Sequence, residues 1–97
     1  MSNKKYDKGF PFSHKEVSEN TFIRKFSKDV SKDDLVWHRD KESREVEVLS
    51  GKDWKFQRED LLPISLNVGD KVFIKKNEWH RILKGSSDLV LKINFLK

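Results

Sequence analysis

The distribution of apolar and polar residues along the chain predicts short strands. In "REVEVLSG", residues 44–51, Val46 and Val48 alternate with two glutamates, which is the period-two pattern of a strand with one buried face. In "DLVLKINFL", residues 88–96, apolar side chains again recur at every second position. No segment shows a convincing amphipathic helical period, so we expect a chain built from strands and turns.

Similar short apolar segments follow one another along most of the chain. The expected strands are, in order, "TFIRKFS", "LVWHRD", "REVEVLSG", "WKFQ", "ISL", "KVFIK", "EWHRIL" and "DLVLKINFL". About eight strands at nearly even spacing, with turn residues between them, indicate a sandwich or a barrel. We therefore expect an all-β fold, a small antiparallel β-barrel formed by residues 21–97.

The first twenty residues differ from the rest of the chain. They are polar, contain Gly9 and Pro11, and show no sustained period. We expect residues 1–20 to form an irregular N-terminal arm, in which "SHKEVSEN" could form one helical turn at most. A chain of 97 residues has no room for a second core, so this arm and one barrel domain account for all of it.

Composition and charge limit the classes of molecule that the protein could bind. The chain is 38% charged with a net charge of +5, which would attract phosphates or nucleic acid. The lysines are, however, spread among acidic residues, and no aromatic and basic platform for nucleic acid is evident. There is no cysteine, which excludes disulfides and thiolate metal sites. Without an apolar stretch that resembles a signal peptide or a membrane span, we expect a cytoplasmic protein with no membrane partner.

Two of the expected strands carry histidines together with other polar residues. "WHRDKESR", residues 37–44, contains His38, Asp40 and Arg44, and "EWHR" contains His80. Side chains alternate along a strand, so His38 and Asp40 should share one face. Arg44 should share the inward face of the two valines that follow it. The pattern predicts a polar pocket inside the barrel.

The spacing of these residues resembles that of the cupins, small β-barrels of the jelly-roll type. His38 stands where the first cupin motif has its first histidine, and Gly51 follows thirteen residues later, as in that motif. Gly69 and His80 are eleven residues apart, as are the glycine and histidine of the second motif. In the turn between them, Asn77 replaces a glycine, and asparagine tolerates the left-handed conformation better than most residues.

The chain departs from the cupin pattern where metal ligands are concerned. Asp40 replaces the second histidine and Arg44 replaces the glutamate. The resemblance implies a mononuclear divalent metal, Fe, Mn, Ni or Zn, held by His38, Asp40 and His80, and two imidazoles with one carboxylate are a coherent donor set for Fe(II). Arg44 cannot be a ligand because its guanidinium stays protonated. Its planar fork suits a carboxylate or phosphate on a small anionic ligand.

The alternative is a metal-free module that binds a ligand or is only structural, in which Asp40 pairs with Arg44 instead. The resemblance does not select a reaction, because cupins include dioxygenases, isomerases, lyases and storage proteins. Whether the chain is an enzyme stays open at this stage. Homodimers are common among small cupins, so the resemblance also implies a homodimer.

Three further kinds of residue lie near the predicted pocket in the sequence pattern. Gln57, at the end of "WKFQ", is a candidate for orienting a ligand, although Trp54 and Phe56 could equally form the inward face of that strand. Trp37 and Trp79 each precede a site histidine, so alternation should point both away from the pocket. A third histidine lies in the arm and is given no role.

Overall fold

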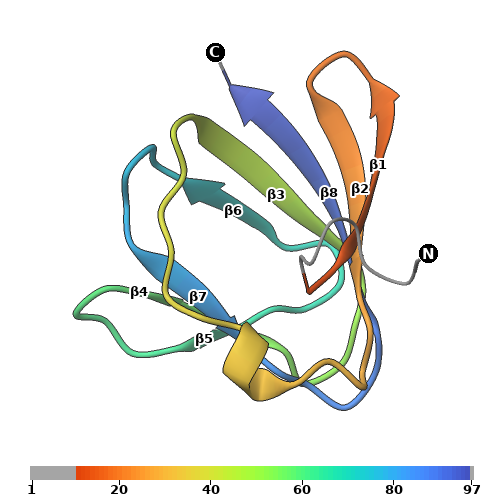
Figure 1. Ribbon diagram of the computed structural model, residues 1–97, viewed down its shortest axis with the longest axis vertical. Helices are drawn as coiled ribbons and strands as arrows, with labels where there is room; N and C mark the ends of the chain where they lie inside the picture. The colour runs from red at the N-terminus through yellow and green to blue at the C-terminus, as the bar shows by residue number, and fades with distance from the viewer. Residues whose placement is uncertain (1–10, 97) are drawn as a thin grey trace.

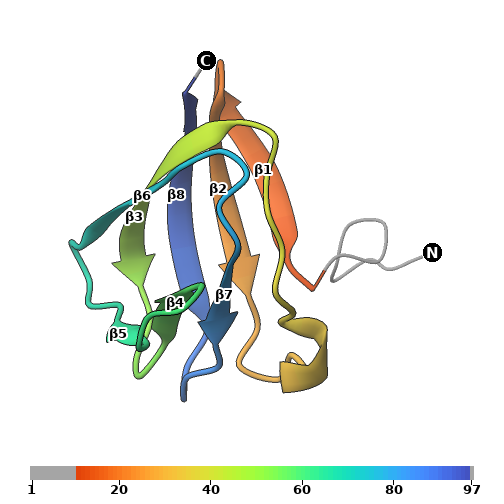
Figure 2. The same cartoon turned by 90° about the vertical axis from the view of Figure 1, so that its left-hand side faces the viewer.

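The structure, a computed structural model that describes residues 11–96, consists of two antiparallel sheets that face each other (Figures 1 and 2). The larger sheet has the order β1 (Ser13–Ser18), β2 (Thr21–Phe26), β8 (Leu89–Leu96), β3 (Ser43–Ser50) and β6 (Lys71–Ile74). The smaller sheet has the order β5 (Ile64–Ser65), β4 (Lys55–Arg58) and β7 (His80–Leu83). The predicted all-β fold is confirmed, and none of the helical structure in residues 11–96 is long and apolar enough to cross a membrane.

One expected strand does not form. The segment "LVWHRD", residues 35–40, follows the short 3-10 helix η1 (Lys32–Asp34) and contains no named strand. It approaches β7 at a single point, where His38 and His80 form an isolated bridge. The remainder of the segment forms no further bridge, so its alternation of side chains does not extend into a ladder.

The second half of the expected arm is a strand. β1 pairs with β2 in antiparallel register, with His14 opposite Arg24 and Glu16 opposite Phe22. Asn20 adopts a positive φ of 64° in the tight connection to β2, as asparagine tolerates in hairpin turns. The sequence pattern of β1 is weak because this edge strand has no fully buried residue. Residues 1–10 of the arm lie outside the described residues.

The core lies between the two sheets. The largest fully buried side chains are Trp54, Leu89, Ile93, Val30 and Val48. The alternation predicted for β3 and β8 is confirmed, since every inward residue from Val46 to Val48 and from Leu89 to Ile93 is buried. Burial of each such side chain contributes about 1.5–3 kcal/mol, and this term holds the sheets together.

Gly51 and Gly69 occupy backbone conformations that favour glycine, with φ of 148° and 93°. At Gly51 a methyl group would also lie 2.7 Å from Cδ1 of the fully buried Leu89, whereas at Gly69 it would meet no atom within 4 Å. We predict that both alanine variants lower the free energy of unfolding through backbone strain of about 1–3 kcal/mol. Gly51→Ala should cost more than Gly69→Ala because of the added clash.

Urea denaturation of the two variants measures this difference. An effect of Gly51→Ala equal to or smaller than that of Gly69→Ala would contradict the close packing of Gly51 against Leu89.

Candidate metal and ligand site

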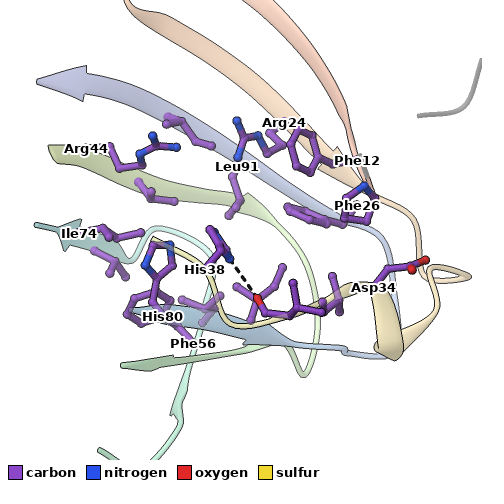
Figure 3. A pocket seen from close by; sticks show the side chains of 18 residues that line it. Phe12, Arg24, Phe26, Asp34, His38, Arg44, Phe56, Ile74, His80 and Leu91 are labelled. Carbon is purple, nitrogen blue, oxygen red and sulfur yellow. Dashed lines mark hydrogen bonds between the residues drawn. The ribbon is translucent and has the colours of Figure 1, made fainter. Parts of the chain in front are cut away.

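A cavity of about 340 Å³ lies between the two sheets (Figure 3). Its wall is mainly apolar and comes from both sheets, and includes Phe26, Val46, Phe56, Ile74, Leu91 and Ile93. His38, His80 and Arg44 line the same cavity. Its volume is at the lower end of the range of about 300–1,000 Å³ that is typical of small-molecule pockets.

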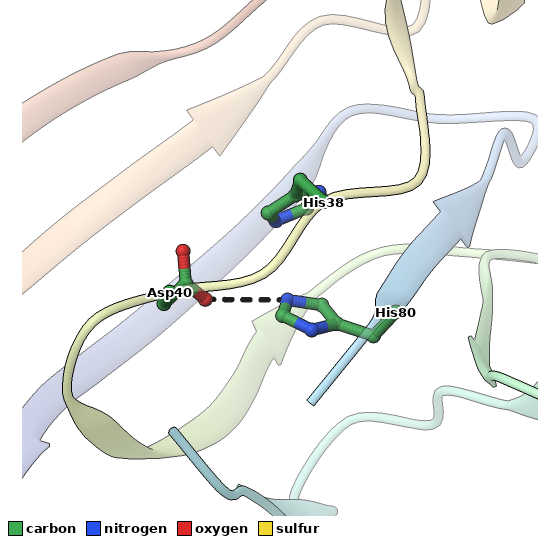
Figure 4. Close-up of side chains that lie close together, drawn as sticks. All are labelled: His38, Asp40 and His80. Atoms are coloured by element: carbon green, nitrogen blue, oxygen red, sulfur yellow. Dashed lines mark ion pairs between the residues drawn. The ribbon is translucent and has the colours of Figure 1, made fainter. Parts of the chain in front are cut away.

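The backbones of His38 and His80 are hydrogen-bonded to each other. The His38 N–H donates to the His80 carbonyl over 3.0 Å, and the His80 N–H donates to the His38 carbonyl over 2.9 Å. In an antiparallel pair that exchanges both hydrogen bonds, the side chains project on the same side. The ring centroids are accordingly 4.3 Å apart, at an angle of 61° (Figure 4).

Asp40 completes the group. Its Oδ2 lies 3.3 Å from Nε2 of His80, and donor atoms of His38, Asp40 and His80 all lie within 4.8 Å of one another (Figure 4). The Asn77 N–H donates to the Asp40 carbonyl over 2.7 Å and so fixes this part of the loop. Asn77 has a φ of 64°, the left-handed conformation predicted for it from the sequence.

Backbone carbonyls fix the tautomers of both rings. Nδ1 of His80 is 2.8 Å from the Glu78 carbonyl, and Nδ1 of His38 is 3.1 Å from the Val36 carbonyl. A carbonyl only accepts, so each Nδ1 must carry a hydrogen, and in the neutral ring Nε2 then presents a lone pair. The same tie orients metal-ligating histidines in proteins. Partial burial lowers the pKa of His38, which favours the neutral imidazole that a metal requires.

Arg44 also contacts Asp40, but without forming a hydrogen bond. Arg44 is buried on β3, with Nε 3.4 Å from Asp40 Oδ2 and Nη2 donating to Glu42 over 2.8 Å. Asp40 Oδ2 and Arg44 Nε are both buried and have no hydrogen-bond partner among residues 11–96. Burial alone would raise the pKa of Asp40, but the contacts with His80 and Arg44 outweigh it and lower the pKa, so this group is a carboxylate.

This arrangement fits a cation. Asp40 Oδ2 and His80 Nε2 face each other at 3.3 Å, and the other ring nitrogen of His80 is already engaged by the Glu78 carbonyl. A positive charge beside both atoms stabilises this pair, and either a second proton on the His80 ring or a metal ion would supply it. A metal ion that contacts these atoms and His38 would satisfy the buried oxygen, so the donor set present suits a divalent metal.

Arg24 also lines the cavity, although the sequence pattern did not identify it as a site residue. It projects from β2, its Nε donates to His14 Nδ1 over 3.2 Å, and its guanidinium lies 3.9 Å from the centre of the Phe12 ring. Burial and the neighbouring Arg44 lower the pKa of Arg24 to about 10, so it remains charged at neutral pH. Its alternation with the buried Phe26 could have placed it inside, by the argument that placed Arg44 there.

Gln57 does not join the other predicted site residues. Alternation on β4 directs Phe56 into the cavity and Gln57 away from it. The Gln57 side-chain amide donates to the Leu61 carbonyl over 2.9 Å and accepts from Arg81 Nε over 2.8 Å. Gln57 therefore ties the β4–β5 connection to β7 rather than lining the pocket.

Trp37 and Trp79 point away from the cavity, as alternation predicts. They are 37% and 38% exposed. The guanidinium of Arg81 lies 4.6 Å from the centre of the Trp37 ring, and that of Arg39 lies 5.1 Å from the centre of the Trp79 ring. Neither tryptophan is among the residues that line the cavity.

No family model and no curated protein matches the sequence, but solved structures match the fold. A cupin-2 domain protein from Shewanella frigidimarina aligns with a TM-score of 0.65 and 14% identity, over 94% of this chain and 85% of its own. A structure of the DMSP lyases RdDddP and RnDddQII gives a TM-score of 0.68 and 14% identity, over 79% and 37%. The fold is that of the cupins. Fe(II) HppE aligns with a TM-score of 0.61 and 18% identity, over 78% and 41%.

The chain therefore spans about two fifths of the length of two of these structures and most of the cupin-2 domain protein. Gly51 and Gly69, the two glycines that match the cupin motifs, both have a positive φ and lie after β3 and before β6, respectively. The two aligned histidines lie in the loop before β3 and at the first residue of β7.

The tautomers of the three histidines should differ in a testable way. His38 and His80 should carry hydrogen on Nδ1, because each Nδ1 faces a carbonyl. His14 should carry hydrogen on Nε2, because its Nδ1 accepts from Arg24, which makes it an internal control. Long-range proton–nitrogen correlation spectra at neutral pH distinguish the two forms. A neutral His38 or His80 ring with its hydrogen on Nε2 and not on Nδ1 would contradict the geometry of the site.

Proposed function

We propose that this protein binds one divalent metal ion through His38, Asp40 and His80, and binds a small anionic molecule in the adjoining cavity. The observation that carries the metal proposal is the buried Asp40 Oδ2, which makes no hydrogen bond with residues 11–96 and lies 3.3 Å from His80 Nε2. The orientation of both rings by backbone carbonyls supports it.

The donor set suits Fe(II), Mn(II), Ni(II) or Zn(II). Three protein ligands leave coordination positions open, so a bound ion could polarise an oxygen atom of the ligand as a Lewis acid. One protein of similar fold is described as Fe(II) HppE. Others are described as DMSP lyases, so the fold alone does not select a reaction.

Arg44 supplies positive charge beside this site. Its fork is engaged by Glu42 and lies against Asp40, and its guanidinium carbon is 4.4 Å from the centre of the Phe95 ring. This held geometry lets the buried charge attract an anion in the cavity without losing conformational freedom. We propose that it contributes to ligand binding and keeps Asp40 ionised.

A second candidate function is a metal-free binding module. The approach of Arg44 Nε to within 3.4 Å of Asp40 favours it, because that ion pair neutralises the carboxylate without a metal. The two candidates differ in metal content and in what Arg44 does for stability.

Metal content tests the first candidate directly. We expect untagged protein, loaded with Fe(II), Mn(II), Ni(II) or Zn(II) and desalted, to retain about one equivalent of at least one of these ions. His38→Ala and His80→Ala should each lose it because only two donors remain. His14→Ala is the matched control and should retain the ion, since His14 lies outside the donor group. Elemental analysis of the desalted proteins provides the measurement.

If none of the four ions is retained, or if retention is the same in all three alanine variants, the metal-free module is the better description.

Replacement of Arg44 by leucine tests the role of the ion pair. Arg44→Leu leaves the Asp40 carboxylate, whose side chain is only 17% exposed, without its cationic neighbour, so the melting temperature should fall. A metal ion would replace the lost positive charge, so adding the retained metal should raise the melting temperature of Arg44→Leu by more than that of the wild type.

Differential scanning fluorimetry with and without the metal checks this expectation. A variant that stays unfolded even with metal would show that Arg44 serves the fold rather than the ligand.

Association into a homodimer and a cytoplasmic location stay predictions. Light scattering coupled to size-exclusion chromatography would reveal a homodimer as a mass of twice the 11.6 kDa of the chain.

A further inference from the structure

We propose that Arg24 is the residue that binds the anionic group of the ligand, and that the ligand is an organic anion with an apolar body. The inference rests on the proposed function in one respect, namely that a small molecule occupies the cavity between the sheets. It adds the residue that holds the charged end of that molecule and the chemical class to which the molecule belongs.

The donors of Arg24 are only partly used within the protein. Nε donates to His14, and one face of the guanidinium packs on Phe12. Among residues 11–96, no acceptor is within hydrogen-bonding distance and geometry of its two Nη atoms, and no carboxylate forms an ion pair with it. Arg44 differs, because its Nη2 already donates to Glu42 and its Nε lies beside Asp40.

The contacts with His14 and Phe12 therefore hold Arg24 in a fixed position, while the donors on its two Nη atoms remain available. A guanidinium that is already held loses little freedom when a carboxylate or similar anion binds to its paired donors. Figure 3 shows Arg24 and Arg44 lining the same cavity, with Phe12 beside Arg24. An anion between the two guanidinium groups would offset the repulsion between two partly desolvated positive charges.

The charge distribution of the wall indicates how the ligand is oriented. The carboxylate among the lining residues belongs to Asp34, which Figure 3 shows at the opposite end of the cavity from Arg44. Most of the remaining wall is apolar, including Phe26, Leu91 and Ile93. A molecule that is anionic at one end and apolar along its body matches this wall, whereas a uniformly polar molecule would leave apolar surface without contacts.

Hexanoate and its neutral amide, hexanamide, are suitable probes because they share the same apolar body. Isothermal titration calorimetry on protein treated with EDTA keeps metal coordination out of the measurement. We expect hexanoate to bind about tenfold or more tightly than hexanamide, since a charge-assisted hydrogen bond is lost with the amide.

Two variants of Arg24 and one matched control connect this preference to the residue. Arg24→Gln should weaken hexanoate binding by about tenfold and leave hexanamide binding unchanged, and Arg24→Lys should give a smaller loss because it keeps the charge but not the fork. Lys25→Gln removes one positive charge from the exposed face of the same strand and should change neither affinity. If Arg24→Gln does not fold, the comparison of Arg24→Lys with Lys25→Gln carries the test.

The inference is overturned if hexanoate and hexanamide bind equally, if neither binds, or if the Arg24 variants bind hexanoate as the wild type does. It is also overturned if hexanoate binds only to metal-loaded protein and does so independently of Arg24, because the carboxylate would then be a metal ligand. Binding that depends on Arg24 in protein that retains no metal would support the inference while the metal part of the proposed function failed. If the protein retained metal but bound hexanoate independently of Arg24, the metal part of the proposed function would hold and this inference would fail.

Discussion

The exchange of two backbone hydrogen bonds between His38 and His80 is the contact on which the site depends. It joins a loop that is otherwise outside both sheets to the first residue of β7. Because the exchange fixes the side of the pair on which both rings project, it also decides that both rings lie near Asp40. This bridge holds His38 beside the cavity that it lines.

The charged residues inside the fold need neighbouring groups that offset their buried charge. Arg44 is buried, Asp40 is nearly so, and Arg24 lies against the same cavity. A small protein can keep such groups inside only if each finds compensation. For Arg44 this comes from Glu42 and Asp40, but Asp40 Oδ2 still lacks a hydrogen bond among the described residues. This incomplete compensation distinguishes the candidate site from the apolar core around it.

Much of the fold could be predicted because a strand with one buried face alternates apolar and polar residues in the sequence. Val46 and Val48 on β3, and the alternating apolar residues of β8, identified the inward face, and Arg44 was placed there by the same alternation. β1 was missed because an edge strand with both faces partly exposed leaves no such record. "LVWHRD" was wrongly expected to be a strand because alternation over a few residues cannot reveal whether a backbone ladder forms, and here only His38 bridges to β7.

The sequence by itself determined the all-β fold, the inward position of Arg44, and the two histidines with an aspartate as a group, because alternation and motif spacing are local properties of the chain. Only the tertiary structure decided the remaining features of the site. His38 reaches His80 through a bridge rather than a ladder, Gln57 faces away, and Arg24 stands in the cavity supported by Phe12 and His14. These features depend on which segments the two sheets bring together, and contacts between residues far apart in the sequence leave no pattern in either segment alone.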